Sequence, residues 1–221
     1  MNKTAVITGA NRGIGLELVK HYLKLGWQVY GICREASEAL KSSGATVVAG
    51  IDVAAAACTS RLQTALQKVK IDLLINNAGI LRDERLGELN FATIEEQFQV
   101  NTLGPLRVTE ALLDNMVQGT KVALVTSRMG SIADNTSGGR YGYRMSKAAL
   151  NIAGVSLAHD LKGQGVAVAI LHPGYVATDM VGGRGDITPE VAASRLAARI
   201  EGLTLENSGT FWHSNGEVLP W

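Results

Sequence analysis

The sequence predicts an α/β protein in which helices cover both faces of a parallel β-sheet. Short, almost continuously apolar segments alternate along the chain with longer segments of helical periodicity, which is the pattern of a doubly wound sheet, here of about seven strands. The chain has 221 residues, a length that suits one domain with a large buried core. The sequence shows no internal repeat and no linker, so we expect a single domain over residues 1–221.

The individual elements follow from the positions of the apolar residues. Strands are expected at residues 5–8, 28–33, 46–49, 73–76, 121–126, 166–172 and 209–212. Helices are expected at residues 15–25, 55–69, 94–117, 143–162 and 189–203. Gly26 stands where the first helix should end, because glycine accepts the conformation that closes a helix. Two glycine-rich stretches, residues 136–139 and 181–185, lie outside this alternation and are either mobile loops over a substrate site or surface turns.

Composition and charge exclude several classes of partner. The formal net charge is +1, and charged residues make up 19% of the chain without a long run of one sign. This balance gives no electrostatic basis for binding nucleic acid or an anionic membrane. No apolar run approaches the roughly 20 residues that a transmembrane helix needs, and the N-terminus lacks the pattern of a signal peptide. We therefore expect a soluble, cytoplasmic protein that binds neither nucleic acid nor a membrane.

The cysteine and histidine content argues against a metal centre. Cys33 and Cys58 are the only cysteines, and they show neither a CxxC nor a Cys/His spacing. The four histidines do not cluster along the chain. Such a pattern predicts no metal site and no disulfide framework, and it is typical of proteins in a reducing compartment.

A glycine-rich turn joins the first predicted strand to the first predicted helix. Its glycines, Gly9, Gly13 and Gly15, allow the backbone to turn sharply and to approach a pyrophosphate, and free N–H groups at the helix start attract negative charge. A glycine-rich turn alone is a weak signal, but this position at the head of an alternating α/β chain makes it a strong one. The turn therefore predicts a dinucleotide-binding site.

The spacing TGxxxGxG of this turn resembles that of the short-chain dehydrogenase/reductase family. The resemblance continues in the family's order through five further motifs: Asn76-Asn77-Ala78-Gly79, Asn101, Ser127, Tyr143-x-x-x-Lys147 and Pro173-Gly174. It covers nearly the whole chain. It implies a Rossmann-type fold and an oxidoreductase that transfers hydride between a nicotinamide and a carbonyl or alcohol group of a small molecule.

The resemblance also implies which residues bind the cofactor. The glycine turn would line the pyrophosphate, Asp52 would contact the adenine, and Asn77 would brace the sheet beside the adenosine ribose. The segment that starts at Pro173 would lie against the nicotinamide. The complete set of expected cofactor-binding residues is Gly9, Asn11, Arg12, Gly13, Ile14, Gly15, Arg34, Asp52, Val53, Asn77, Ala78, Gly79, Asn101, Tyr143, Lys147, Pro173, Gly174, Val176 and Thr178.

The end of the second strand decides between NADP and NAD. An acidic residue there would hold the ribose hydroxyls of NAD and repel a 2′-phosphate. The position is occupied by the neutral Cys33, followed by Arg34, and Arg12 in the glycine turn can approach the same phosphate. Two guanidinium groups suit a phosphate, so NADP(H) is the expected cofactor. NAD(H) stays open as the alternative, because a small shift would place Glu35 at the ribose.

Tyr143 and Lys147 are the expected centre of catalysis. They are four residues apart on a predicted helix and therefore lie on one face. A free tyrosine has a pKa of about 10, and a nearby ammonium group is expected to lower it toward the range of a useful acid and base.

Two further residues complete the expected catalytic set. Ser127 follows the fifth strand, where its hydroxyl would stabilise charge on the substrate oxygen. The resemblance assigns Asn101 to a local distortion of the long helix and to a water that connects Lys147 with solvent. Ser131 is a weaker rival to Ser127 because it lies farther beyond the strand, and Tyr141 has no lysine four residues later.

The stretch between Ser127 and Tyr143 is longer than in many family members. The added residues are expected at 133–139, in a loop over the substrate. Together with the sequences around Ser127 and Tyr143, this stretch resembles the carbonyl-reductase branch that includes C-factor and Sniffer.

Two other functions stay open, a regulatory or signalling protein that binds NADP with little turnover and an epimerase or dehydratase on the same scaffold. The apolar helices at 94–117 and 143–162 resemble the pair through which family members form dimers, so a homo-oligomer, a dimer or tetramer, is expected.

Overall fold

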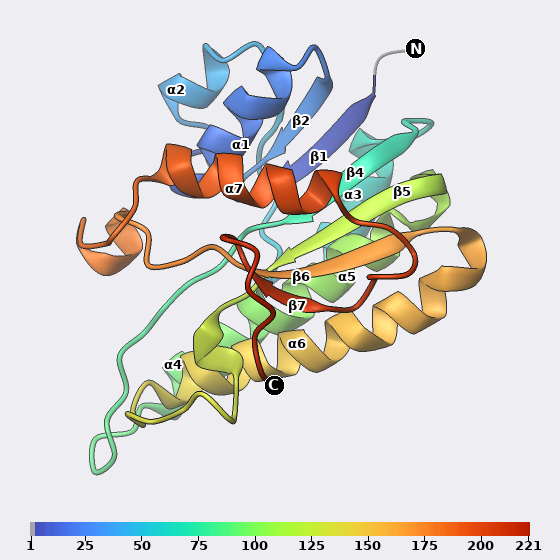
Figure 1. Cartoon of the computed structure of the whole chain (residues 1–221). Helices are drawn as coiled ribbons and strands as arrows, with labels where there is room; N and C mark the ends of the chain where they lie inside the picture. The colour runs from blue at the N-terminus through green and yellow to red at the C-terminus, as the bar shows by residue number, and fades with distance from the viewer. Residues whose placement is uncertain (1–2) are drawn as a thin grey trace.

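The computed structural model describes residues 3–221 and has a seven-stranded parallel sheet at its centre (Figure 1). The strands are β1 (Thr4–Thr8), β2 (Gln28–Ile32), β3 (Thr46–Val48), β4 (Ile71–Asn76), β5 (Met116–Val125), β6 (Ala167–His172) and β7 (Phe211–His213). Their order in the sheet is β3-β2-β1-β4-β5-β6-β7, and all neighbours pair in parallel. The chain thus winds outward in both directions from β1 and β4, which confirms the predicted fold class.

Helices cover both faces of this sheet. They are α1 (Gly13–Lys24), α2 (Glu38–Lys41), α3 (Cys58–Ala65), α4 (Phe91–Phe98), α5 (Gly104–Ala111), α6 (Tyr141–Leu161) and α7 (Pro189–Glu201). Short helical turns of other types are η1 (Gln99–Leu103), η2 (Leu113–Asn115), η3 (Arg128–Gly130), η4 (Lys162–Gln164) and η5 (Asp179–Val181). In Figure 1, α1 and α7 lie on one face of the sheet and α3, α5 and α6 on the other.

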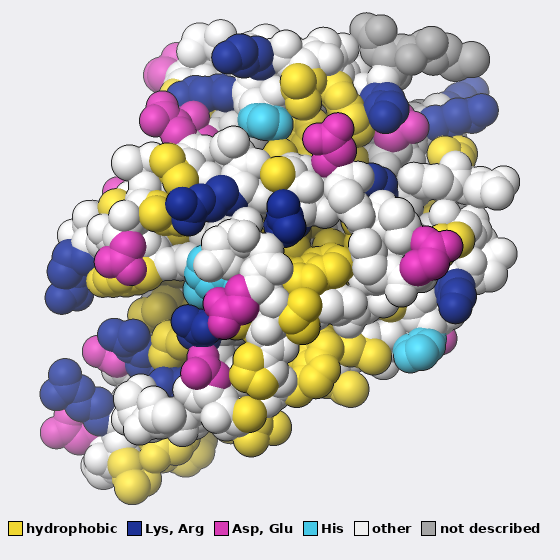
Figure 2. All heavy atoms as spheres, viewed as in Figure 1, with side chains coloured by type: hydrophobic (Ala, Val, Ile, Leu, Met, Phe, Trp, Pro, Cys, Tyr) yellow, Lys and Arg dark blue, Asp and Glu magenta, His cyan; other side chains and the backbone are white. Residues whose placement is uncertain are grey.

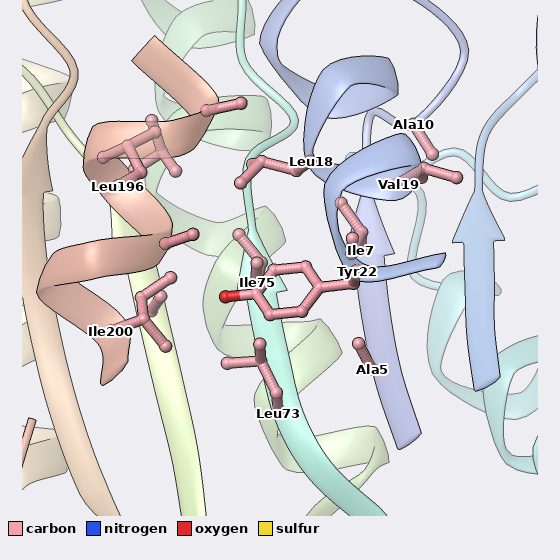
Figure 3. Packing of buried hydrophobic residues seen from close by; sticks show 14 of the residues in the cluster. Ala5, Ile7, Ala10, Leu18, Val19, Tyr22, Leu73, Ile75, Leu196 and Ile200 are labelled. Atoms are coloured by element: carbon pink, nitrogen blue, oxygen red, sulfur yellow. The ribbon is translucent and has the colours of Figure 1, made fainter. Parts of the chain in front are cut away.

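The buried strand residues divide between these two faces with a period of two, as a pleated strand requires. Along β1, Ala5 and Ile7 belong to the core beneath α1 and α7, whereas Val6 belongs to the core beneath α3, α5 and α6. Figure 3 shows the first of these cores, where Tyr22 of α1 and Ile200 of α7 pack over the strands. Because both faces are buried, the strands are apolar throughout, and this is why they were recognisable in the sequence.

The helix predicted at 94–117 is wrong as a continuous element. The chain forms α4, then the π-helical turn η1, then α5, and β5 already begins at Met116. Pro105, the second residue of α5, has no N–H group and cannot donate to the carbonyl group of residue 101, which disrupts the regular helix there. Met116 pairs with Ile71 of β4, so sheet pairing takes over where the helical periodicity still continues.

The other differences are small. Helix α6 starts at Tyr141 rather than at residue 143, and α3 is shorter than the predicted helix at 55–69. Strand β7 begins two residues later than predicted. The four-residue helix α2 was not predicted. Ser37 begins it by accepting a hydrogen bond from the N–H of Leu40 (3.2 Å).

Candidate active site

A cleft of about 560 Å³ opens at the carboxyl ends of the strands, beside the point where β1 and β4 diverge. Open α/β sheets bind their ligands at such a place. Sixteen residues expected at the site line the cleft: Gly9, Asn11, Arg12, Gly13, Ile14, Gly15, Arg34, Asp52, Val53, Asn77, Ala78, Gly79, Tyr143, Lys147, Pro173 and Thr178. The tertiary fold therefore brings together motifs from almost the entire chain.

The glycine turn is packed too closely for side chains. Gly9 has a positive φ of +64°, and a Cβ atom there would lie 2.9 Å from the Cα of Ala78. A Cβ on Gly15 would collide with the carbonyl oxygen of Gly9. The Asn77 amide donates to the carbonyl oxygens of Thr8 (3.0 Å) and Gly9 (3.3 Å). Asn77 thus holds the turn open at the edge of the cleft, which agrees with its expected bracing role.

The start of α1 faces this cleft and can accept an anion. Arg12 precedes the helix in an extended conformation, and its side chain makes no capping hydrogen bond within the described residues. The first N–H groups of any α-helix have no intrahelical partner, and the Arg12 side chain does not occupy those of α1. Free N–H groups at a helix start, together with a glycine turn that lets a ligand approach the backbone, fit a dinucleotide pyrophosphate.

Arg12 and Arg34 both line the cleft, whereas Glu35 is exposed and lies outside it. The Arg12 guanidinium forms an ion pair with Asp179 (3.1 Å), a residue that the sequence did not single out. Both side chains are more than 70% exposed, and such exposed pairs contribute little stability. Arg12 is therefore held near the cleft by an interaction that a phosphate can readily replace.

Asp52 lies in the cleft on a turn that its own side chain stabilises. Its carboxylate accepts a hydrogen bond from the N–H of Ala54 (3.0 Å). Val53, the next residue, packs against Gly104, where a Cβ atom would lie 2.9 Å from a methyl group of Val53. The segment after β3 is thus fixed against α5.

Tyr143 and Ser127 form a buried hydroxyl pair. Tyr143 is 8% exposed and Ser127 is 7% exposed. Burial raises the pKa of Tyr143 above its ordinary value, and the hydrogen bond with Ser127 and the positive charge of Arg140 oppose this rise only in part. The expectation that Lys147 would lower the pKa of Tyr143 is wrong for this structure, because removal from water dominates.

Lys147 lies on the same helical face as Tyr143, as predicted, with its ammonium group 5.8 Å from the centre of the tyrosine ring. The ammonium donates a hydrogen bond to the carbonyl oxygen of Val125 at the end of β5 (2.9 Å). Burial lowers the pKa of Lys147 to about 8. Lys147 is therefore a poorly solvated cation that still has hydrogen-bonding capacity at the floor of the cleft.

Asn101 is fully buried within the π-helical turn η1, outside the cleft lining. Its side-chain oxygen accepts from the N–H of Ile80 (2.8 Å), and its amide donates to the carbonyl oxygen of Ile80 (2.9 Å) and to the Ser146 hydroxyl (3.1 Å). The helix distortion expected at this position is present. Asn101 connects the segment after β4 with α6, the helix of Tyr143 and Lys147.

The sequence analysis did not identify the residues through which η3 packs closely against α6. A Cβ atom on Gly130 would lie 2.7 Å from the backbone of Lys147, so only glycine allows this contact. Thr126 donates to Asn151 of α6 (2.6 Å), which in turn donates to the carbonyl oxygen of Gly130 (3.4 Å). Thr126 and Asn151 are polar residues in otherwise apolar segments near the expected catalytic pair, and buried polar residues need hydrogen-bond partners. This was the signal by which the sequence could have revealed the contact.

Two expected cofactor-binding residues and the rival serine lie outside the cleft. Gly174 and Val176 do not line the cleft; they shape the segment after β6, where Val176 is buried and pairs with Ile187. Ser131 is buried and accepts a hydrogen bond from the N–H of Asp134 (3.1 Å), away from the cleft. Cys33, expected at the end of the second strand, also lines the cleft. Other residues that line it were not predicted: Ile32, Ile51, Ala54, Ile80, Arg82, Glu96, Val100, Val125, Thr126, Ala177, Asp179, Met180 and Pro189.

Three observations bear on metals, disulfides and membranes. Cys33 and Cys58 are buried free thiols whose pKa values burial raises. Over residues 3–221, the His, Cys, Asp and Glu side chains nowhere gather in groups of three or more that could hold a metal ion. None of the helices in the described part of the chain has both the length and the apolar character needed to span a bilayer.

The family model for short chain dehydrogenases matches residues 3–187. The chain is 42% identical to 1-hydroxy-2-glutathionyl-2-methyl-3-butene dehydrogenase of Rhodococcus sp. (strain AD45), an alignment that covers 99% of both chains. It is 46% identical to the C-signal of Myxococcus xanthus over 68% of this chain and 93% of the relative.

Among solved structures, the fold is similar to that of NADPH-bound carbonyl reductase from chicken fatty liver. The TM-score is 0.88 at 28% identity, and the match covers 100% of this chain and 99% of the other. This likeness agrees with the predicted resemblance to carbonyl reductases. The chain belongs to the short-chain dehydrogenase family and is an oxidoreductase that transfers hydride.

Proposed function

We propose that the protein is an NADP(H)-dependent carbonyl reductase or alcohol dehydrogenase that acts on a small molecule. The observation that carries this proposal is the pair of buried residues Ser127 and Tyr143, which hydrogen-bond to each other, together with the cleft of about 560 Å³ that Tyr143 and Lys147 line. The glycine turn and the start of α1 would hold the pyrophosphate, and Asp52 would lie at the adenine. When bound, the nicotinamide supplies the hydride for reduction or accepts it for oxidation.

The protein's own residues would position and protonate the substrate oxygen. Ser127 would donate a hydrogen bond to that oxygen and stabilise its growing negative charge. Tyr143 would deliver a proton to it during reduction and remove the proton during oxidation. Burial raises the pKa of Tyr143 above its ordinary value, so the phenol is protonated at neutral pH in the ligand-free protein. Lys147 would bind the nicotinamide ribose, and Asn101 would hold α6 in place.

The charges around the cleft support NADP(H) over NAD(H). Arg12 and Arg34 both line it, and the competing Glu35 lies outside it. A carboxylate at this place would repel a 2′-phosphate, whereas two guanidinium groups would bind it. The carbonyl reductase with a similar fold contains bound NADPH, which also supports the proposal.

The Rhodococcus relative suggests a class of substrate. Its name describes oxidation of a compound that carries a hydroxyl group next to a carbon bearing a glutathionyl group. We propose that this protein likewise accepts a hydroxyl or carbonyl carbon with a large polar substituent. The preferred compound can be identified from the absorbance of NADPH. Aldehydes, ketones and quinones would be tested for NADPH consumption, and hydroxyl-bearing glutathione conjugates for NADPH formation from NADP⁺.

Tyr143→Phe tests the assignment. The change removes only the phenol oxygen, so we expect kcat to fall by about 100-fold or more, the usual range for loss of a general acid. Affinity for NADP⁺, measured by calorimetric titration, should stay within about twofold because the ring and Lys147 remain. A variant that keeps most of its activity on a good substrate would refute the role of Tyr143.

A second candidate function is signalling through a partner, favoured by the identity of 46% to the C-signal. The two functions differ in their need for turnover. If Tyr143→Phe abolished reduction and left a signalling activity intact, binding rather than catalysis would be the basis of the signal.

Two further properties belong to this proposal. We propose a cytoplasmic location, because both cysteines are free and disulfides are rare in a reducing compartment. We also propose a homo-oligomer that uses α5 and α6, since Ile152 on α6 is 65% exposed. Light scattering on the purified protein would give its mass, and Ile152→Glu should reduce it.

A further inference from the structure

A second cavity, of about 610 Å³, lies between residues 83–85 and residues 128–144. We name it the arginine cavity, because its walls include Arg85, Arg128, Arg140 and Arg144. The two segments contact each other through the N–H of Arg140, which donates to the carbonyl oxygen of Glu84 (2.9 Å). Figure 2 shows side chains of both charge signs at the lower left of the molecule, where these loops lie in Figure 1.

Two of the four arginines are neutralised by aspartates of the same walls. Arg128 pairs with Asp134 (2.7 Å), and Arg140 pairs with Asp83 (3.3 Å). These pairs are partly exposed, so they fix the side chains of the wall without contributing much stability. The remaining charged residues of the cavity walls are Glu84, Arg85 and Arg144, which form none of these pairs.

Glu84 lines the cavity as well, but its carboxylate is buried and bound by donors outside the arginines. Its side chain is 2% exposed. The carboxylate accepts from the Gln97 amide (2.6 Å), the Thr93 hydroxyl (2.9 Å) and the N–H of Gly142 in the first turn of α6 (3.2 Å). These donors and the start of α6 stabilise the carboxylate without an ion pair, so Glu84 forms no direct pair with an arginine of the cavity among the described residues.

Arg85 and Arg144 are the uncompensated cations. The guanidinium of Arg144 donates to the carbonyl oxygens of Gly138 and Gly139 (both 3.2 Å) and to the Ser137 hydroxyl (2.9 Å), all uncharged groups. Neither Arg85 nor Arg144 is within 4.0 Å of a carboxylate in the described residues 3–221. The four arginines and the three carboxylates of Asp83, Glu84 and Asp134 give the cavity walls a formal charge of +1, and Arg128 also lies 3.6 Å from Glu217. Arg85 and Arg144 are thus the two arginines of the walls that no carboxylate of the described chain pairs with.

The arginine cavity also adjoins the proposed reaction centre. Arg128 directly follows Ser127, and Arg144 directly follows Tyr143 on α6. Arg140 is near enough to influence the pKa of Tyr143 through its charge. The cavity walls therefore include the residues next to Ser127 and Tyr143, and the cavity volume lies within the usual range for ligand pockets. A substrate whose reacting carbon lies at Ser127 and Tyr143 would reach this cavity with a substituent that extends past these two residues.

We propose that the arginine cavity binds a carboxylate on the part of the substrate that does not react, through Arg85 and Arg144. Guanidinium groups bind carboxylates in bidentate fashion and prefer them to neutral polar groups. The inference rests on the proposed reductase function, because it places the anionic arm of the substrate beside Ser127 and Tyr143. It adds a requirement of its own, namely that the preferred carbonyl compounds are acids.

Binding to the NADP⁺-loaded protein tests this without turnover, because the oxidised cofactor cannot reduce a ketone. The probes are N-(4-acetylbenzoyl)glutamate and its dimethyl ester, which share the ketone and differ in charge. Calorimetry should show the acid binding about tenfold tighter than the ester, a difference of about 1.4 kcal/mol. Higher salt should weaken only the acid. Equal affinities of the two probes, or no measurable binding of the acid, would overturn the proposal.

Three variants assign the effect to the cavity. Arg85→Gln should reduce the preference for the acid to threefold or less, and Arg144→Lys, which keeps the charge but loses the planar fork, should also reduce it. Arg195→Gln is the matched control, because Arg195 is an exposed arginine on α7 outside both cavities. A preference for the acid that survives both cavity variants would place the carboxylate elsewhere.

NADPH oxidation with the same two ketones separates this inference from the proposed function. If the acid binds preferentially and neither ketone is reduced, the reductase proposal fails for these compounds while the cavity assignment stands. If both are reduced with equal KM values, the reductase proposal stands and the cavity assignment fails.

Discussion

Lys147 keeps a positive charge inside the protein at a cost to stability. Burial lowers its pKa to about 8, below the value of about 10.4 for a free lysine. Between these two values the unfolded chain binds more protons than the folded one, so the free energy of unfolding rises with pH in this range. Below pH 8 the penalty is fully present. The only hydrogen bond recorded for the ammonium within the described residues is the one to Val125.

We therefore expect Lys147→Met to stabilise the ligand-free protein at pH 7 while it abolishes turnover. Removing the buried charge should contribute about 1 to 3 kcal/mol, reduced by the lost hydrogen bond to Val125. Urea denaturation at pH 7 and pH 10 would measure the effect, and the advantage of the variant should shrink at the higher pH. Finding the variant less stable at pH 7, or an advantage that does not change with pH, would contradict the buried-cation argument.

Helix α6 carries Tyr143, Arg144 and Lys147, and its first turn depends on a residue far away in sequence. Arg140 precedes the helix with a positive φ of +49°, a conformation that non-glycine residues rarely adopt. The buried Glu84 carboxylate accepts from the N–H of Gly142 and links this turn to α4 through Gln97. Glu84 is thus a positioning residue for the helix that carries the proposed catalytic pair.

Glu84→Ala should loosen the start of α6. The N–H of Gly142 and the Gln97 amide would lose a buried partner, which costs about 1 to 3 kcal/mol and lowers Tm by about 2 to 10 °C in a protein of this size. We expect kcat to fall more than KM rises, because Tyr143 loses its alignment. Glu88→Ala, an exposed glutamate in the same loop, is the control. Equal effects of the two substitutions on Tm and kcat would show that Glu84 has no special role.

At the scale of the whole molecule, the cleft connects both halves of the sheet. The glycine turn after β1, Asp52 after β3, Asn77 after β4 and Thr178 after β6 all line it. A ligand that contacts all of these segments binds only the folded chain, so its binding free energy adds to the stability of the entire fold.

NADP⁺ should raise Tm more than NAD⁺ does at equal concentration, because Arg12 and Arg34 would bind its 2′-phosphate and so increase its affinity. At about 100 times its dissociation constant, the gain is about 2.7 kcal/mol, or roughly 5 to 10 °C for a protein of this size. Arg34→Asp should reverse the order of the two cofactors, because a carboxylate repels the 2′-phosphate and can hold the ribose hydroxyls. Equal shifts for both cofactors in the wild-type protein would exclude the pairing of Arg12 and Arg34 with a phosphate.

The sequence by itself determined the order of the seven strands, the parallel sheet and about half of the cleft lining. Strands buried on both faces are apolar throughout, and the glycine turn must follow a strand and open a helix, so both features leave a local pattern. The pair Tyr143 and Lys147 was also readable, because four positions along a helix place two residues on one face.

Only the tertiary structure decided what depends on contacts between distant segments. It ended the helix predicted at 94–117 and began β5 at Met116, because pairing with Ile71 overrides local helical periodicity. It placed Glu84 under α6, and it set the pKa directions of Tyr143 and Lys147 through burial. The burial of a side chain depends on which neighbouring elements cover it. The spacing of two residues along one helix does not predict that burial, and so it does not predict the pKa shifts that burial causes.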